Sequence, residues 1–241
     1  AGSKSRDLSV SGSVGSGLVD IDHDVEAGVA VVTLKRAKKF NSLSMNLFHD
    51  IELAFQRISK QEESVRCVVL TGDGANFCAG IDVGVLMSLK QVCSSDPCPA
   101  RSRDNMGKVI SRFQTVMSLP ETCHAPVIAA VHGLCIGAGV DFVTACDLRV
   151  CSSDAVFNVK EADLAIVADL GTLQRLPRCV GEQRARELAL TARNVSGAQA
   201  KEYGLVLDCF DTADATLQGA KDLAATIAGK SSVTVRGIKK T

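Results

Sequence analysis

Three short runs of apolar residues constrain the fold of this chain more than any other feature of its sequence. They span residues 29–34, 65–70 and 126–131 and are almost wholly apolar. Strands of this kind are typical of parallel sheets, because helices cover both faces of such a sheet and bury each strand on both sides. Helical segments lie between the runs. The sequence therefore predicts an α/β domain with a parallel sheet and crossover connections.

The other elements can be placed by their caps and their apolar stripes. Ser44 can cap a helix whose apolar residues, from Leu47 to Ile58, fall on one stripe. Ser196 and Gln199 have the spacing of a capping box. The remaining expectations are helices at 83–89, 106–119 and 213–228, a loop at 93–103 and a strand at 205–207.

One domain is expected to account for most of the chain. Residues 1–20 are rich in Ser and Gly and show no periodicity, which predicts a flexible lead-in. Residues 21–241 contain every periodic segment, and no second boundary or internal repeat interrupts them. A chain of 241 residues can bury a sizeable core, so a single domain over 21–241 is the natural interpretation.

The charge balance and the lengths of the apolar runs give no support to two classes of interaction, nucleic-acid binding and membrane insertion. Lys plus Arg and Asp plus Glu number 27 each, so the formal net charge is zero. A general nucleic-acid binder is expected to carry a basic excess, and we therefore expect no nucleic acid as a partner. No apolar run reaches the roughly 18–20 residues that cross a bilayer, so no membrane span is predicted.

Ten cysteines are the unusual feature of the composition. A disulfide framework is typical of short secreted chains, and no two cysteines have the C-x-x-C spacing of a zinc site. We favour small buried thiols, which indicates a reducing compartment and predicts no metal site. Cys93 and Cys98 lie in a polar stretch and are expected to be exposed and oxidisable.

Two glycine-rich turns follow predicted strands and are the first candidates for chemistry. They are residues 76–82 and 132–141. Such a turn, where it enters a helix, exposes backbone N–H groups at the positive end of the helix dipole. One turn alone is more often just a tight turn. Two of them, each after a parallel strand, can direct two N–H donors at one oxygen, which is the architecture of an oxyanion hole.

Three acidic residues are the second candidates. Asp141 closes the second turn, and Glu161 and Asp169 follow it. Asp169 lies in an apolar run, where burial raises the pKa of a carboxyl group toward the range useful for proton transfer. Asp169 can equally be a helix N-cap, and Glu161 and Asp163 can equally be solvated loop charges. The motifs of serine hydrolases, P-loops and dinucleotide sites are absent from the sequence.

At these residues the sequence resembles the enoyl-CoA hydratase/isomerase, or crotonase, superfamily. The resemblance is carried by residues 77–82 and 126–141 and extends from about Val29 to the C-terminal end. Within the superfamily, residues 144–149, 159–163 and 168–177 are similar to Δ3,5-Δ2,4-dienoyl-CoA isomerases. The resemblance implies a spiral of ββα units, assembled as homotrimers or homohexamers, that acts on an acyl-CoA thioester without any further cofactor.

The resemblance also implies roles for particular residues. The N–H groups of Ile81 and Ala138 would hold the thioester oxygen, and Asp141, Glu161 and Asp169 would be the catalytic acids. The residues expected to bind the substrate are Ala79, Gly80, Ile81, Asp82, Ala138 and Gly139. Moving a 3,5-diene into 2,4-conjugation removes a proton at carbon 2 and adds one at carbon 6. These sites are too far apart for one carboxyl group, so Glu161 and Asp169 are the expected pair, with Asp141 polarising the site.

Two other functions remain open. An enoyl-CoA hydratase usually has Glu where this chain has Asp141, and it has no use for Asp169. A non-catalytic crotonase-like binding protein does not need three acids. The isomerase remains the leading hypothesis. The resemblance places its activity in unsaturated fatty-acid β-oxidation, in the peroxisome or the mitochondrial matrix.

Two segments depart from the family pattern. Ala37 stands where the family commonly has proline, in a segment that contacts coenzyme A. The family also continues beyond the position of Thr241 with helices that cover the acyl pocket or a neighbouring subunit, so those C-terminal helices are expected to be truncated here.

Overall fold

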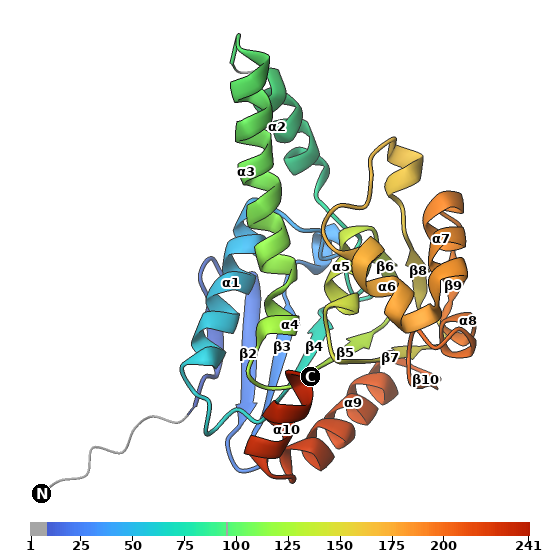
Figure 1. Cartoon of the computed structure of the whole chain (residues 1–241). Coiled ribbons are helices and arrows are strands. Elements are labelled where there is room, and N and C mark those ends of the chain that lie inside the picture. Colours follow the sequence, from blue (N-terminus) through green and yellow to red (C-terminus); the bar gives the residue numbers. More distant parts are fainter. Residues whose placement is uncertain (1–8, 95) are drawn as a thin grey trace, which may run out of the picture.

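The computed structural model describes residues 9–94 and 96–241, and of residues 90 and 92–94 it describes the backbone alone. The Cys93 side chain therefore lies outside the described residues. Within them, seven strands form one sheet in the order β1-β2-β3-β4-β5-β7-β10 (Figure 1). The strands are β1 Gly12–Val14, β2 Val19–Asp24, β3 Val29–Leu34, β4 Cys67–Gly72, β5 Val127–Val131, β7 Leu148–Ser152 and β10 Cys209–Phe210.

The predicted parallel sheet is confirmed. From β3 to β10 all neighbouring strands of the large sheet are parallel, with Val31 opposite Val69 and Val69 opposite Ile128. β1 and β2 extend its edge as antiparallel strands. A second sheet joins β6 Leu134–Ile136, β8 Val156–Asn158 and β9 Val195–Ser196. Strand β6 of this second sheet lies within the second glycine-rich turn, residues 132–141.

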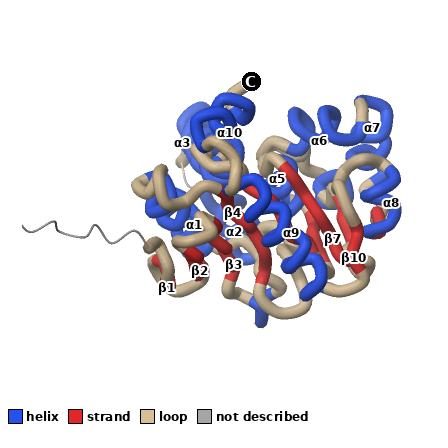
Figure 2. The backbone as a smooth tube through the Cα atoms, turned by 90° about the horizontal axis from the view of Figure 1, so that it is seen from below, coloured by secondary structure: helices blue, strands red, loops and turns tan. Residues whose placement is uncertain are grey.

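Helices cover both faces of the large sheet. Figure 2 shows α9 lying across the strands on one face, with α1 and α3 on the opposite side. The longer helices are α1 Met45–Ser59, α2 Val83–Ser94, α3 Pro99–Met117, α6 Thr172–Val180, α7 Glu182–Thr191 and α9 Ala213–Ala228. The shorter ones are η1 Ala37–Lys39, α4 Leu119–Thr122, α5 Ala138–Thr144, η2 Glu161–Leu164, α8 Gly197–Glu202 and α10 Ser232–Lys239.

The strand side chains divide between two hydrophobic clusters, one on each face. Val31, Val69 and Ile128 pack with Ala220 and Ala224 of α9. The alternate positions of the same strands, with α1 and α3, form the larger cluster on the other face. This division explains why the strands read as unbroken apolar runs, because neither face is exposed to water.

Residues 1–20 were predicted to be a flexible lead-in, but the described part of this segment contains regular structure. Gly12–Val14 is β1, and β2 begins at Val19. The buried carboxylate of Asp50 on α1 accepts hydrogen bonds from the backbone N–H groups of Ser16 and Leu18 at 2.9–3.1 Å, and from Ser16 Oγ at 2.8 Å. A tertiary contact therefore orders a segment whose composition is typical of a linker.

Two other predictions were wrong. The loop expected at 93–103 is short, because α3 begins at Pro99, a residue well suited to the first helical position. Figure 1 shows α2 and α3 side by side, rising away from the sheet. The first turns of α3 are largely exposed and have no apolar stripe, so the sequence pattern did not predict that they are helical. The strand expected at 205–207 is displaced to β10, whereas α9 and the Ser196–Gln199 capping box were predicted correctly.

A buried lysine fixes α10 to the start of β5. Lys239 Nζ donates to Asp147 at 2.6 Å and to the carbonyl groups of Pro120 and Ala125 at 2.7 and 3.0 Å, and its side chain is 6 % exposed. Asp147 in turn accepts from Val127 N at 2.7 Å. The ammonium group is therefore fully satisfied at a place where an unpaired charge would be costly.

Replacing Lys239 with Met is expected to lower the free energy of unfolding by about 1–3 kcal/mol, because Asp147 and two carbonyl groups lose their donor. Urea-induced unfolding measures this loss. Lys240→Met is the matched control, since Lys240 is exposed, and its effect should stay within about 0.5 kcal/mol. Equal effects of the two substitutions would contradict the anchoring role.

Candidate active site

The two glycine-rich turns lie side by side. Residue Cys78 of the first turn pairs with β6: its N–H donates to Leu134 O at 2.9 Å, and its carbonyl accepts from Ile136 N at 3.0 Å. Gly139, at the start of α5, allows this approach, because a Cβ there would lie 2.7 Å from Cys78 O. Hydrogen bonding to β6 thus joins two segments that are about 60 positions apart in the chain.

This contact brings two backbone N–H groups together. Gly80 has a φ of +89°, and a Cβ built on it would lie 2.8 Å from Ile136 O and 3.7 Å from Ala138 N. The N–H groups of Ile81 and Ala138 donate no hydrogen bond to any other part of the chain that the structure describes. Ala138 also opens α5, so its N–H lies at the positive end of a helix dipole. Two unused donors at one place are what an oxyanion hole requires.

A cavity of about 80 Å³ lies in front of these donors. Both turns and all three predicted acids contribute to its wall. Of the nine predicted site residues, seven line it: Ala79, Gly80, Ile81, Ala138, Asp141, Glu161 and Asp169.

Asp141 is the most buried of the three acids. It lies on α5, is 1 % exposed, and its Oδ1 accepts from Thr172 N at 2.6 Å. Burial raises the pKa of Asp141 to about 6, the negative charge of Asp169 adds to this effect, and hydrogen bonding from Thr172 opposes it. The carboxyl group is thus fixed in orientation and titrates near neutral pH.

Glu161 lies across the cavity, at the start of η2. It is 9 % exposed, and its Oε1 would lie 3.2 Å from a Cβ on Gly137, the residue before α5. Its Oε2 is buried and finds no hydrogen-bond partner within residues 9–94 and 96–241. Burial, followed by the charges of Asp141 and Asp169, raises the pKa of Glu161 to about 7. Glu161 is therefore not a solvated loop charge, unlike Asp163, which is exposed and paired with Lys160.

Asp169 lies at the mouth of the cavity. Its neighbours Ala168 and Leu170 are buried, whereas its own side chain is exposed. Partial burial raises the pKa of its carboxyl group. The alternative role of Asp169 as an N-cap does not hold, because Gly171 occupies the N-cap position of α6.

Asp82 and Gly139 do not reach the cavity. Asp82 forms an ion pair with Arg36 at 2.7 Å and accepts from Gly84 N at 2.8 Å, so it anchors the start of α2. The hydrogen bond from Arg36 holds the pKa of Asp82 below its usual range. Gly139 is buried and allows the close approach of the two turns.

Sequence reasoning missed the apolar part of the cavity wall. Its residues come from four separate segments of the chain: Leu86, Ile136, Leu164, Ile166 and Leu170. A larger cavity of about 440 Å³ adjoins it, shares Glu161 and Ile166, and is lined mainly by apolar residues of the segment 166–168 and of α6 and α7. Only the folded chain places these side chains together.

Metal and membrane features can be judged for the described residues alone. No group of three or more His, Cys, Asp or Glu side chains among them is arranged to hold a metal ion. None of their helices combines the length and the apolar character needed to traverse a bilayer. Six of the described cysteines are buried, as predicted: Cys67, Cys78, Cys123, Cys135, Cys146 and Cys151. Cys98, expected to be exposed, is half-buried.

Comparison with known sequences finds one family over most of the chain. Residues 24–241 match the family model described as enoyl-CoA hydratase/isomerase. A peroxisomal Δ(3,5)-Δ(2,4)-dienoyl-CoA isomerase from Arabidopsis thaliana is 43 % identical over 91 % of this chain and 78 % of the relative. The mitochondrial enzyme of the same name from Homo sapiens is 42 % identical over 86 % of this chain and 63 % of its own length.

Solved structures agree with the expected fold class. An enoyl-CoA hydratase from Bacillus anthracis superimposes with a TM-score of 0.79 at 32 % identity, covering 92 % of this chain and 81 % of the other. An enoyl-CoA hydratase from Mycobacterium smegmatis gives a TM-score of 0.81, also at 32 % identity and with the same coverage. The fold class implied by the resemblance is therefore confirmed.

The geometry of the first turn leads to a prediction about Gly80. Gly80→Ala should lower the free energy of unfolding by about 1–3 kcal/mol, because a side chain is strained at this φ and meets Ile136 O. Thermal or urea unfolding measures the loss. Gly107→Ala is the control: Gly107 lies inside α3 with open space around it, so this substitution should raise stability by about 0.5–1 kcal/mol. A neutral Gly80→Ala would contradict the close approach of the two turns.

Proposed function

This chain belongs to the enoyl-CoA hydratase/isomerase family, and we propose that it converts 3,5-dienoyl-CoA thioesters to 2,4-dienoyl-CoA thioesters in unsaturated fatty-acid β-oxidation. The observation that carries the proposal is one cavity walled by three carboxyl groups of raised pKa and by two amide donors that no described residue accepts from. The names of the curated relatives from Arabidopsis thaliana and Homo sapiens support the same reaction.

The two amide donors serve the charge that develops during the reaction. Removing a proton from carbon 2 delocalises an electron pair onto the thioester oxygen and forms a dienolate. The N–H groups of Ile81 and Ala138 hold that oxygen. Because they are fixed by the backbone and surrounded by protein, they need no reorganisation when the charge appears, and losing one such donor typically costs about 10²–10³ in rate.

The positions of the acids suggest which proton each one moves. Glu161 faces the start of α5, beside Ala138, and carbon 2 is bonded to the thioester carbon held there. Glu161 therefore removes the proton from carbon 2. Asp169, at the mouth of the cavity, delivers a proton to carbon 6 while the electron pair returns from the oxygen to form the 2,4-diene. The enzyme is left with Glu161 protonated and Asp169 ionised, and exchange with solvent restores the pair.

Asp141 has a supporting role in this scheme. Its carboxylate is held by Thr172 N and contributes to the raised pKa of Glu161. A hydratase instead needs two carboxylates that hold one water molecule, and the short side chain of Asp141, turned toward Thr172, suits that task poorly. A non-catalytic binding protein gives no reason for three carboxyl groups with raised pKa around one cavity.

The remaining expectations become part of the proposal. The substrate is an acyl-CoA thioester. Coenzyme A is part of this substrate, and the reaction uses no separate cofactor. The chain assembles as a homotrimer or homohexamer. Ala37, in η1, replaces the family's proline in the segment proposed to contact coenzyme A. The relatives are named as peroxisomal or mitochondrial, and we place this chain in one of these two compartments.

Substitution of the two proton-transferring acids tests the proposal directly. Glu161→Gln and Asp169→Asn should each lower kcat for 3,5-dienoyl-CoA by about 10²–10⁴, because each removes one proton-transfer group. The absorbance of the conjugated 2,4-dienoyl product measures the rate. Undiminished activity in both variants would show that the assigned roles are wrong.

Asp163→Asn is the matched control, because Asp163 lies in η2 with Glu161 but is exposed and paired with Lys160. Its activity should equal that of the unsubstituted chain. A parallel assay with a 2-enoyl-CoA separates the alternative: ready hydration without isomerisation would establish a hydratase.

The pH dependence follows from the same pair. The reaction needs one proton shared between Glu161 and Asp169. In the one-proton form the proton lies mainly on Glu161, whose pKa is raised to about 7, and the reactive arrangement, with Glu161 ionised and Asp169 protonated, is its minor tautomer. Above about pH 7 the pair loses this proton, and at low pH both carboxyl groups are protonated, so either change removes the reactive arrangement. A plot of kcat/KM against pH should therefore be bell-shaped with its alkaline limb near pH 7. A rate that keeps rising from pH 7 to 9 would contradict this proton count.

A further inference from the structure

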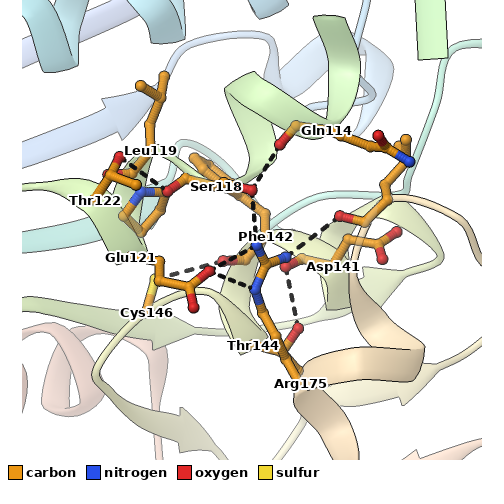
Figure 3. Close-up of polar contacts among 12 residues, drawn as sticks. Gln114, Ser118, Leu119, Glu121, Thr122, Asp141, Phe142, Thr144, Cys146 and Arg175 are labelled. Carbon is orange, nitrogen blue, oxygen red and sulfur yellow. Dashed lines mark hydrogen bonds and ion pairs between the residues drawn. The ribbon is translucent and has the colours of Figure 1, made fainter. Parts of the chain in front are cut away.

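The segment from Asp169 to Thr172, which leads into α6, is held at two carbonyl groups by side chains. Arg175 of α6 donates from Nη1 to Leu170 O at 3.3 Å. Gln114 of α3 donates from Nε2 to Asp169 O at 2.7 Å. Figure 3 shows Gln114 and Arg175 reaching this region from opposite sides, with Asp141 beside them. The backbone that carries Asp169 is thus fixed by an element remote in sequence and by its own helix.

The Arg175 guanidinium is anchored in turn. Its Nε and Nη2 donate to Glu121 Oε2 of α4 at 3.0 and 2.8 Å, and Nη2 also donates to Ser118 Oγ at 2.7 Å. Its side chain is 12 % exposed. Gly171 has a φ of +126°, and a Cβ there would lie 1.8 Å from Arg175 Nη1, so the guanidinium lies directly against the backbone of the segment.

Two of the three carboxyl groups depend on this segment. Asp169 is its first residue, and Thr172 N at its end donates to Asp141 Oδ1 at 2.6 Å. We propose that Arg175 and Gln114 are positioning residues, which hold the segment so that Asp169 faces the reactive cavity and Thr172 orients Asp141. This inference rests on the proposed isomerase function for its kinetic consequences, whereas the restraint on the backbone is independent of it.

Arginine suits this position because its planar fork can bind the carboxylate, the hydroxyl and the carbonyl group at once. A lysine has one nitrogen and can satisfy only part of this set. The substitution Arg175→Lys should therefore restore part of what Arg175→Met loses, which a merely space-filling role would not predict.

Kinetics of four variants test the inference. Arg175→Met should lower kcat about 10- to 100-fold with little change in KM, because Asp169 is misplaced while the oxyanion donors remain. Arg175→Lys should recover part of this loss, and Gln114→Leu should lower kcat less than Arg175→Met does. Arg178→Met is the matched control: Arg178 lies on the same helix, is exposed, and makes none of these contacts, so kcat should not change.

Amide hydrogen exchange supplies a readout that does not need activity. The Thr172 N–H should exchange faster in Arg175→Met and Gln114→Leu than in the unsubstituted chain, with the urea midpoint recorded to exclude global unfolding. Unchanged exchange and unchanged kcat would overturn the positioning role, as would equal losses in Arg178→Met. An unsubstituted chain that does not isomerise 3,5-dienoyl-CoA would overturn the proposed function, and the exchange experiment would still decide whether the segment is held.

Discussion

The contact between the two glycine-rich turns is the constraint on which the rest of the site depends. Cys78 pairs with β6 through two backbone hydrogen bonds, and Gly80 and Gly139 leave out the side chains that would prevent this approach. The contact places the N–H groups of Ile81 and Ala138 together. Helix α5 begins at the same contact and carries the buried Asp141. The same backbone geometry therefore positions both the N–H donors and the Asp141 carboxyl group.

Around that backbone, the protein gathers carboxyl groups under conditions that favour protonation. Burial is the largest cause of the raised pKa of Asp141 and Glu161, and mutual repulsion adds to it. A group that keeps a proton near neutral pH can both accept and donate it, which is the requirement of an isomerisation in which one proton leaves and another arrives. The arrangement costs stability, since Oε2 of Glu161 is buried and has no hydrogen-bond partner among the described residues, and this cost is typical of functional sites.

The sequence predicted the parallel core well and its surroundings less well. Strands β3 and β5 could be predicted from their apolar runs, because a strand that is buried on both faces consists mainly of apolar residues. β1 and the first turns of α3 were missed, since neither carries its own apolar pattern: β1 is ordered by the contact of Asp50 with Ser16 and Leu18. Asp82 fell in the right motif, but the proximity of Arg36, 46 positions earlier, decides where its side chain points.

By itself, the sequence determined the parallel α/β fold, the two turns and the three acids, because apolar periodicity and glycine spacing are local properties that burial and backbone geometry impose. The tertiary structure alone decided which of the predicted residues face one cavity, which apolar side chains complete its wall, and that Arg175 and Gln114 hold the segment bearing Asp169. Those relations join segments far apart in the chain, and no local pattern encodes the distance between them.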